Sequence, residues 1–80
     1  MTTDEIREQL TELLQDLLDR DDLAITRETT AKDVEGWDSL AHVRIVVAVE
    51  QKFGIRFTTT EMTDLPNVGA MIDAIARKIG

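Results

Sequence analysis

Three residue types that serve in nucleophilic hydrolysis stand close together near the middle of the sequence: Asp38, Ser39 and His42. In a hydrolase triad, the histidine bonds the nucleophile through one ring nitrogen and the carboxylate through the other. Here all three residues would lie within about one helical turn, with Asp38 directly before Ser39, which does not suit that geometry. The sequence also lacks the Gly-x-Ser-x-Gly pattern of a nucleophile elbow. We therefore expect no catalytic residue, and we expect His42 to be a solvated helix residue.

A run of acids at Asp19, Asp21 and Asp22 is similar to the opening of a calcium-binding loop. The pattern fails further along, because Ala24 stands where glycine is needed and Thr30 stands where glutamate is needed. The chain has one histidine and no cysteine, which leaves no ligand set for a transition metal. We expect no metal site.

The elements that position Asp38 and Ser39 follow from hydrophobic spacing. A helix is predicted near residues 4–18, because leucine and isoleucine recur there at spacings of three and four without a glycine or proline. Thr3 and Asp4 are its candidate N-caps.

Two further helices are predicted near the end of the chain. Thr58 and Glu61 have the spacing of a capping box, which predicts a short helix that ends before Pro66. Asn67 then caps a last helix with one apolar face, and Gly80 ends it.

The connection at residues 19–37 has no helical period, and a connection of this length inside a small domain is often functional. We expect Leu23, Ile25 and Val34 to hold it against the core.

The segment from His42 to Val49 is ambiguous from its residues alone. Its β-branched side chains favour a strand, and residues 55–58 alternate so that they could pair with it in a hairpin. Asp38 and Ser39, however, are typical N-caps, and an isolated hairpin would be weak. The spacing favours a helix that closes with Phe53, which we expect to be buried. The expected fold is all-α, a four-helix bundle with three longer helices, one short helix and a long loop between helices 1 and 2.

Length and charge restrict the class of protein further. Eighty residues fit one domain, 1–80, and nine Lys+Arg against sixteen Asp+Glu give a net charge of −7. Residues 1–38 hold twelve acids and four bases, and residues 39–80 hold four acids and five bases. Such acidity disfavours nucleic acid and anionic membranes and suits basic patches on protein partners. The longest apolar run, Ile45–Val49, is too short to span a bilayer. The sequence has no cysteine and therefore no disulfide, so we expect a cytoplasmic protein.

The stretch Gly36-Trp37-Asp38-Ser39-Leu40 stands where the long connection meets the central helix, and by itself it reads as an ordinary helix cap. It closely resembles the attachment motif of acyl carrier proteins. The resemblance continues through residues 40–55, where Glu50-Gln51-Lys52-Phe53-Gly54 is similar to the Glu-x-x-Phe-Gly pattern of that family, and it includes Pro66-Asn67-Val68 and Ile72. The resemblance implies a helix at residues 42–49.

The resemblance also implies that Ser39 carries 4′-phosphopantetheine and that Asp38 helps to present it to a phosphopantetheinyl transferase. The chain has no thiol of its own, so the thiol that holds a thioester would come from coenzyme A. Free amides and the positive dipole end at a helix start favour the phosphate. The implied protein is a monomeric single acyl carrier domain, 1–80. It would be not an enzyme but a carrier of acyl or aminoacyl groups, with acyl-loading and acyl-processing enzymes as partners.

The predicted docking face departs from that of fatty-acid carriers, which carry several acids on the outward side of the second helix. Here that face would consist of Leu40, Ala41, Arg44, Val47, Glu50 and Gln51. Because like charges across an interface are costly, docking with fatty-acid enzymes is disfavoured. We expect a carrier in polyketide or other secondary-metabolite biosynthesis. The alternative is a small acidic helical adaptor that binds protein partners without modification.

Overall fold

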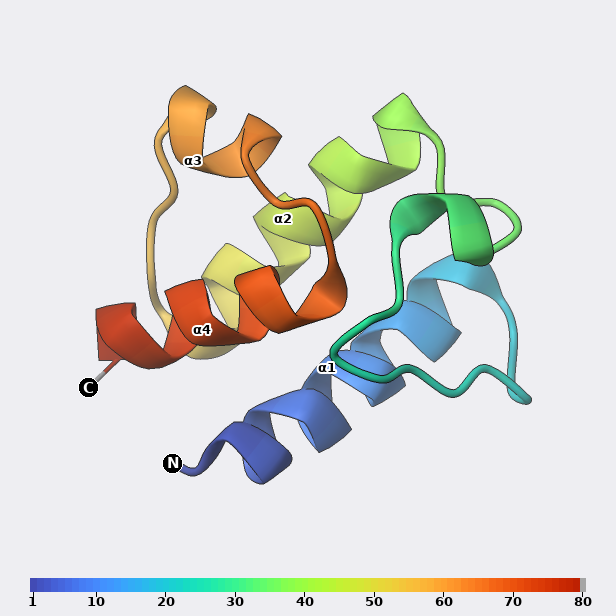
Figure 1. Ribbon diagram of the computed structural model, residues 1–80, viewed down its shortest axis with the longest axis horizontal. Coiled ribbons are helices and arrows are strands. Elements are labelled where there is room, and N and C mark those ends of the chain that lie inside the picture. The colour runs from blue at the N-terminus through green and yellow to red at the C-terminus, as the bar shows by residue number, and fades with distance from the viewer. Residues whose placement is uncertain (80) are drawn as a thin grey trace.

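The computed structural model describes residues 1–79, and within that range all regular secondary structure is helical. The elements are α1 (Thr3–Leu18), the short 3-10 helix η1 (Ala31–Asp33), α2 (Ser39–Phe53), α3 (Thr59–Thr63) and α4 (Val68–Ile79). The long α1–α2 connection runs along one side of the molecule, and α3 lies on the opposite side (Figure 1). The expected all-α architecture of three longer helices and one short helix is confirmed, and the hairpin alternative for residues 42–58 is wrong.

The core lies where α1 contacts both α2 and α4. The apolar stripe of α1 faces inward, and the connection and the α2–α3 link add side chains of their own. The buried cluster comprises Ile6, Leu10, Leu14, Ile25, Val34, Trp37, Ile45, Val49, Ile55, Val68, Met71, Ile72 and Ile75. Phe53 was expected to be buried and is only half-buried at the edge of this cluster, because the helix ends there and Gly54 turns the chain with φ +67°.

The first helix begins one residue earlier than predicted. Its N-cap is Thr2, not Thr3 or Asp4, because Thr2 is the residue that lies three positions before Glu5. The Glu5 amide donates to Thr2 Oγ1 at 3.2 Å, and the Thr2 amide donates to Glu5 Oε1 at 2.9 Å. This reciprocal pair satisfies two amides that a helix start otherwise leaves unpaired.

The two later helices begin as their sequences predict. The Glu61 amide donates to Thr58 Oγ1 at 3.1 Å, and the Thr58 amide donates to Glu61 Oε1 at 2.9 Å. The Ala70 amide donates to Asn67 Oδ1 at 2.8 Å, which confirms Asn67 as the cap of α4. Gly80, the predicted end of that helix, lies outside the described residues.

The long connection is held against the core and against the start of α4. Ile25 and Val34 are buried as expected, and Leu23 packs against the core from a half-buried position. The Val68 amide donates to the Thr29 carbonyl oxygen at 2.8 Å, which joins the connection to α4.

The following α4 residue brings the connection even closer. The Gly69 amide donates to the Arg27 carbonyl oxygen at 2.9 Å, and a Cβ at position 69 would lie only 3.0 Å from that oxygen. The Arg27 guanidinium also bonds Asp73 at 2.8 Å. This approach explains why glycine is the residue present in the first turn of α4.

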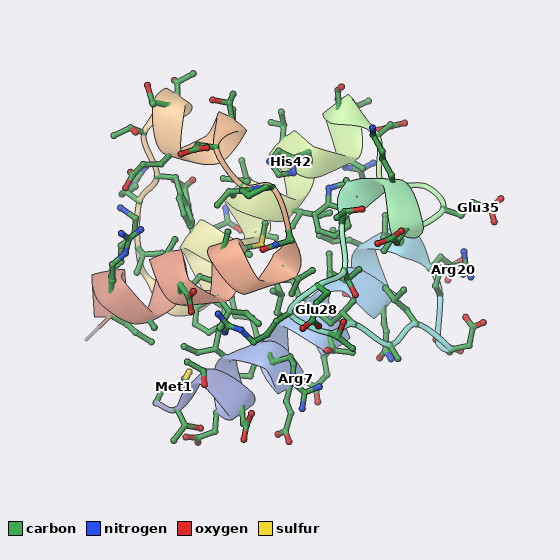
Figure 2. All side chains as sticks on the ribbon, viewed as in Figure 1. Met1, Arg7, Arg20, Glu28, Glu35 and His42 are labelled. Atoms are coloured by element: carbon green, nitrogen blue, oxygen red, sulfur yellow. The ribbon has the colours of Figure 1, made fainter. Side chains whose placement is uncertain are left out.

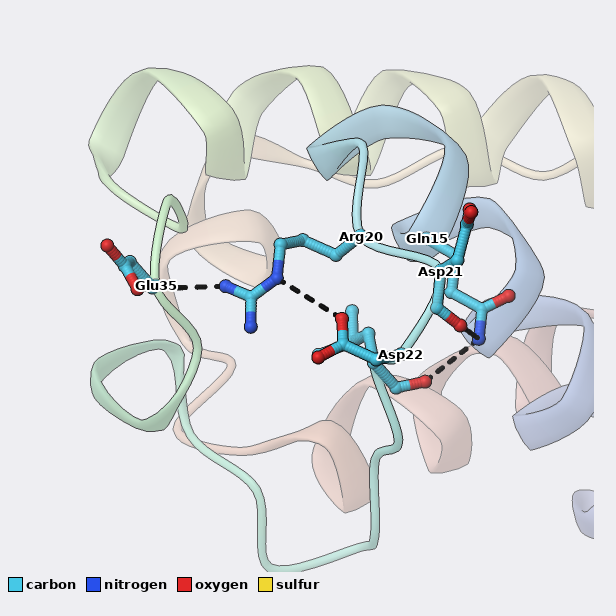
Figure 3. Close-up of polar contacts among 6 residues, drawn as sticks. Gln15, Arg20, Asp21, Asp22 and Glu35 are labelled. Atoms are coloured by element: carbon cyan, nitrogen blue, oxygen red, sulfur yellow. Dashed lines mark hydrogen bonds and ion pairs between the residues drawn. The ribbon is translucent and has the colours of Figure 1, made fainter.

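A second set of polar contacts closes the beginning of the connection (Figure 3). The Gln15 side-chain amide donates to the carbonyl oxygens of Asp21 and Leu23 at 3.3 and 2.9 Å. Arg20 pairs with Asp22 at 3.5 Å and reaches across to Glu35 at 3.8 Å. Glu35 directly precedes Gly36. The contacts of Arg20 therefore link the two ends of the connection.

Candidate functional site

Ser39 is the first residue of α2 and its side chain is exposed. The helix starts there because the Asp38 carboxylate accepts a hydrogen bond from the Ala41 amide at 2.8 Å, while Asp38 itself has an extended backbone. Just before it, Gly36 turns the connection with φ +92°, a conformation that favours glycine. Asp38 caps the helix and leaves the neighbouring Ser39 hydroxyl facing solvent.

The residues on either side of Ser39 are fixed by a pair of aromatic rings. Trp37 is only 8% exposed and donates from Nε1 to Nδ1 of His42 at 3.1 Å. The two rings stack at a centroid distance of 6.1 Å. His42 points from α2 toward α3, where its Nε2 lies 2.8 Å from the carbonyl oxygen of Met62 (Figure 2). These partners assign the proton of a neutral imidazole to Nε2.

The expectation that His42 is solvated is therefore wrong, because the imidazole is half-buried and links three segments of the chain. The expectation that it forms no triad has a geometric basis. Both ring nitrogens are engaged, one by Trp37 and one by Met62, and neither by Asp38 or Ser39. A histidine held in this way does not activate the Ser39 hydroxyl.

The predicted docking residues occupy one side of α2 but differ in exposure. Leu40 and Val47 are exposed at 70% and 45%, and Val43, which is not part of the predicted face, is exposed at 43%. Arg44 and Gln51 are exposed as well. A large exposed leucine at the start of α2 is the kind of apolar side chain that marks an interaction surface when others lie near it.

The remaining two predicted docking residues are half-buried: Ala41 and Glu50. Ala41 packs against the core cluster. The Glu50 carboxylate accepts a hydrogen bond from the Phe57 amide at 2.8 Å, so it holds the α2–α3 link. No local sequence pattern predicts this bond, since Glu50 lies in α2 and Phe57 lies in the link that follows it. A docking role for Glu50 stays a prediction beside this structural role.

The charged groups with clearly shifted pKa values lie away from Ser39 and stabilise the bundle. The Thr58 amide, followed by Lys78, lowers the pKa of Glu61. The Thr2 amide lowers the pKa of Glu5 in the same way. The lowered pKa values of Glu5 and Glu61 are explained by helix caps and by the contact with Lys78, and neither group is placed for proton transfer at Ser39.

No metal centre or membrane span is evident in the part of the chain that the structure describes. Among residues 1–79 there is no group of three or more His, Cys, Asp or Glu side chains that could hold a metal ion. Over the same range, no helix is both long enough and apolar enough to cross a membrane.

Residues 8–75, which include Ser39, match the family model described as the phosphopantetheine attachment site. An acyl carrier protein of Acidothermus cellulolyticus is 33% identical, with 95% of this chain and 90% of that protein covered. The polyketide-8 synthase acyl carrier protein 2 of Streptomyces avermitilis is 30% identical, with coverages of 92% and 85%.

Two solved structures have the same arrangement of helices. The solution structure of holo acyl carrier protein from Geobacter metallireducens is 36% identical and superposes with a TM-score of 0.84, covering 90% of this chain and 83% of that one. The acyl carrier protein of Thermotoga maritima, at 22% identity, gives a TM-score of 0.85 over 96% and 89% and supports the fold alone. This chain belongs to the acyl carrier protein family, whose members are carriers and not catalysts.

Proposed function

We propose that Ser39 carries a 4′-phosphopantetheine arm on which acyl or aminoacyl groups are held as thioesters and presented to separate enzymes. The observation that carries this proposal is an exposed serine at the first residue of a long helix, inside the matched attachment-site region. Ser39 is also the only serine in the sequence. The family assignment does not name the modified residue, and the exposed position of this single serine supports the choice of Ser39.

In the proposed loading reaction, Ser39 Oγ forms a bond to the phosphorus of coenzyme A that bears the pantetheine. The pyrophosphate bond breaks, adenosine 3′,5′-bisphosphate leaves, and the hydroxyl proton passes to the phosphopantetheinyl transferase. The residues around Ser39 suit this role, because the start of α2 offers a positive dipole end to the phosphate. Asp38 is occupied as a cap, which keeps the helix intact during modification.

The carrier role needs no catalytic group on this chain. A cargo on a covalent arm meets each docked enzyme at a high effective concentration, so the tether replaces repeated free encounters. We propose that residues 1–80 act as a single, monomeric, cytoplasmic carrier domain in polyketide or other secondary-metabolite biosynthesis. The polyketide carrier among the relatives supports this pathway class. The exposed side of α2 supports it too, because Arg44 stands there in place of an acid expected on fatty-acid carriers.

Loading is tested by intact mass after incubation with coenzyme A and a broad-specificity phosphopantetheinyl transferase. Wild type should gain one phosphopantetheine, and Ser39→Ala should gain none. Thr59→Ala is a matched control, because Thr59 is also an exposed hydroxyl at the first residue of a helix, and it should load as wild type does. An arm on Ser39→Ala would refute the assignment. A wild-type protein that never gains the mass would favour the unmodified adaptor.

We further propose that the exposed side of α2 docks the partner enzymes through apolar contacts and a positive charge. Leu40, Val43 and Val47 supply the apolar surface, and Arg44 replaces an acid expected on fatty-acid carriers. A partner that fits this surface presents apolar side chains and an acidic group.

The charge at position 44 is the part of this surface that is simplest to reverse. Arg44→Glu should slow cargo loading by the native partner and speed loading by enzymes with basic docking sites, and both changes should shrink as salt rises. Lys52→Glu is a control with the same charge change on an exposed residue of α2 outside the proposed surface. Equal rates for wild type and Arg44→Glu with both sets of enzymes would contradict a docking role for this residue.

A further inference from the structure

A surface groove of about 660 Å³ lies along the seam between α1 and α2. Its apolar floor consists of three half-buried side chains, Leu13 and Leu17 from α1 and Ala48 from α2. Leu17 also lines a smaller hollow of about 270 Å³, which lies between the last turn of α1 and the first turns of α2. The larger groove therefore occupies the part of the seam that lies further from the start of α2.

The rim of this groove carries charge on both walls. An acidic pair, Glu12 and Asp16, lines it from α1, and Lys52 lines it from α2. All three side chains are exposed, and the ion pairs found among residues 1–79 involve none of them. Like charges four positions apart on a helix repel, so the acidic pair by itself destabilises α1. A base supplied by another molecule would relieve this repulsion.

The groove lies on the side of α2 that faces away from Ser39. Ala48 follows Ser39 by nine positions, which is about two and a half turns of an α-helix and therefore about 180° around its axis. Val43, one turn after Ser39, lies on the same side of the helix as Ser39 and is exposed. A molecule in the groove would therefore leave both the Ser39 hydroxyl and Val43 uncovered.

We propose that this groove docks an amphipathic helix of a partner protein whose apolar stripe is flanked by lysine or arginine. The stripe covers the apolar floor, in the way that a groove between two helices accepts the apolar face of a third. Charge complementarity sets the flank, because the acidic pair attracts bases to the α1 wall and Lys52 repels them from the α2 wall.

This contact goes beyond the proposed carrier function, because it needs neither the arm nor the Ser39 side of α2. A partner bound in the groove holds the carrier domain while the arm stays accessible to the enzymes that act on its cargo. Such a partner raises the effective concentration of the carrier near those enzymes without competing for the attachment residue.

The proposal is tested with a synthetic peptide that is stapled into a helix and has a leucine stripe flanked by lysines. A second peptide has glutamates in place of the lysines. Each is titrated into isotope-labelled apo protein and followed by methyl NMR. The lysine peptide should shift the methyl resonances of the apolar floor and leave those of Val43 unchanged, and the glutamate peptide should bind more weakly. Ser39→Ala should bind the lysine peptide as wild type does.

Charge reversal of the acidic pair tests the position of the contact. In about 0.1 M salt, Glu12→Lys with Asp16→Lys should weaken binding of the lysine peptide by about tenfold and strengthen binding of the glutamate peptide. Asp21→Lys with Glu28→Lys is the matched control, because it makes the same change in net charge on two exposed acids of the long connection that do not line the groove. This control should weaken the lysine peptide by less than about twofold, since distant charges are screened.

Three results would overturn the groove as a docking site for a basic helix. The first is a lysine peptide that leaves the methyl resonances of the apolar floor unshifted. The second is an equal loss of affinity in the charge-reversed and control variants, which would show that the attraction is non-specific. The third is a shift of the same methyl resonances when the protein is concentrated without peptide, which would make a second copy of this chain the occupant. Because the titrations use apo protein, failure of Ser39 to be loaded would overturn the proposed function and leave this contact standing.

Discussion

Replacing His42 with phenylalanine tests whether the imidazole fixes the start of α2. His42 receives a hydrogen bond from Trp37 at 3.1 Å, and its second nitrogen lies 2.8 Å from the Met62 carbonyl oxygen. Phenylalanine keeps an aromatic ring beside Trp37, where the present rings are inclined by only 22°. It has neither nitrogen. The substitution therefore removes two hydrogen bonds and changes packing little.

The cost follows from what each partner loses. A hydrogen bond contributes about 0.5–1.5 kcal/mol net, and a buried donor left unpaired costs about 1–3 kcal/mol. Trp37 is 8% exposed, so its indole N–H finds little water once His42 is gone. The Met62 carbonyl belongs to a half-buried residue and can hydrate more easily. We expect His42→Phe to lower the free energy of unfolding by about 1–3 kcal/mol, which is at least about 4 °C in Tm for a domain of this size.

A double-mutant cycle assigns this loss to the Trp37–His42 pair. Unfolding in denaturant is measured for wild type, His42→Phe, Trp37→Phe and the double variant, by circular dichroism because Trp37 is the only tryptophan. The coupling energy should be about 1 kcal/mol, since the second substitution removes a bond that the first has already broken. A coupling within about 0.3 kcal/mol of zero, or a His42→Phe variant as stable as wild type, would refute the reasoning.

Two further substitutions test the contacts that hold the long connection and α3. Gly69→Ala should destabilise the fold by about 1–3 kcal/mol in denaturant unfolding, because its Cβ would lie 3.0 Å from the Arg27 carbonyl oxygen; an unchanged midpoint would show that the connection yields without cost. The lowered pKa of Glu61 means that its charged form stabilises the fold above the ordinary value of 4.5, and that this stability is lost as pH falls through the folded pKa. Glu61→Gln should therefore unfold with a weaker dependence on pH below 4.5 than wild type, and parallel pH profiles would contradict this.

The elements that the sequence predicted are those whose signals are local. A capping box needs two residues three positions apart, so Thr58 and Glu61 are sufficient to mark the start of α3. The same rule, applied to Glu5, points to Thr2 as the first N-cap. The central helix was harder to predict, because its β-branched residues also suit a strand, although its N-caps and the spacing of its apolar residues favoured a helix.

What the sequence could not predict depends on residues that meet across the fold. The role of His42 needs Met62, twenty positions away in another helix. The need for glycine at position 69 arises from the Arg27 backbone, which nothing local to α4 indicates. The hollow that Leu17, Leu18 and Leu40 help to line likewise exists only where the last turn of α1 meets the start of α2. A residue motif can mark an attachment point, but the surface around it is a tertiary feature.

The contacts around Ser39 are distributed so that the backbone is fixed while the side chain is free. Trp37 is buried before it, Asp38 caps the helix beside it, and His42 anchors the first turn after it. Effective concentration depends on where a tether begins as well as on its length. If the backbone at the attachment residue is fixed, the cargo stays within the volume that the arm can reach from one point. If that backbone moved, the same cargo would be spread over a larger volume and its effective concentration would fall. The buried tryptophan and its histidine partner, which take no part in the chemistry, therefore serve the proposed carrier function by holding the origin of the arm still.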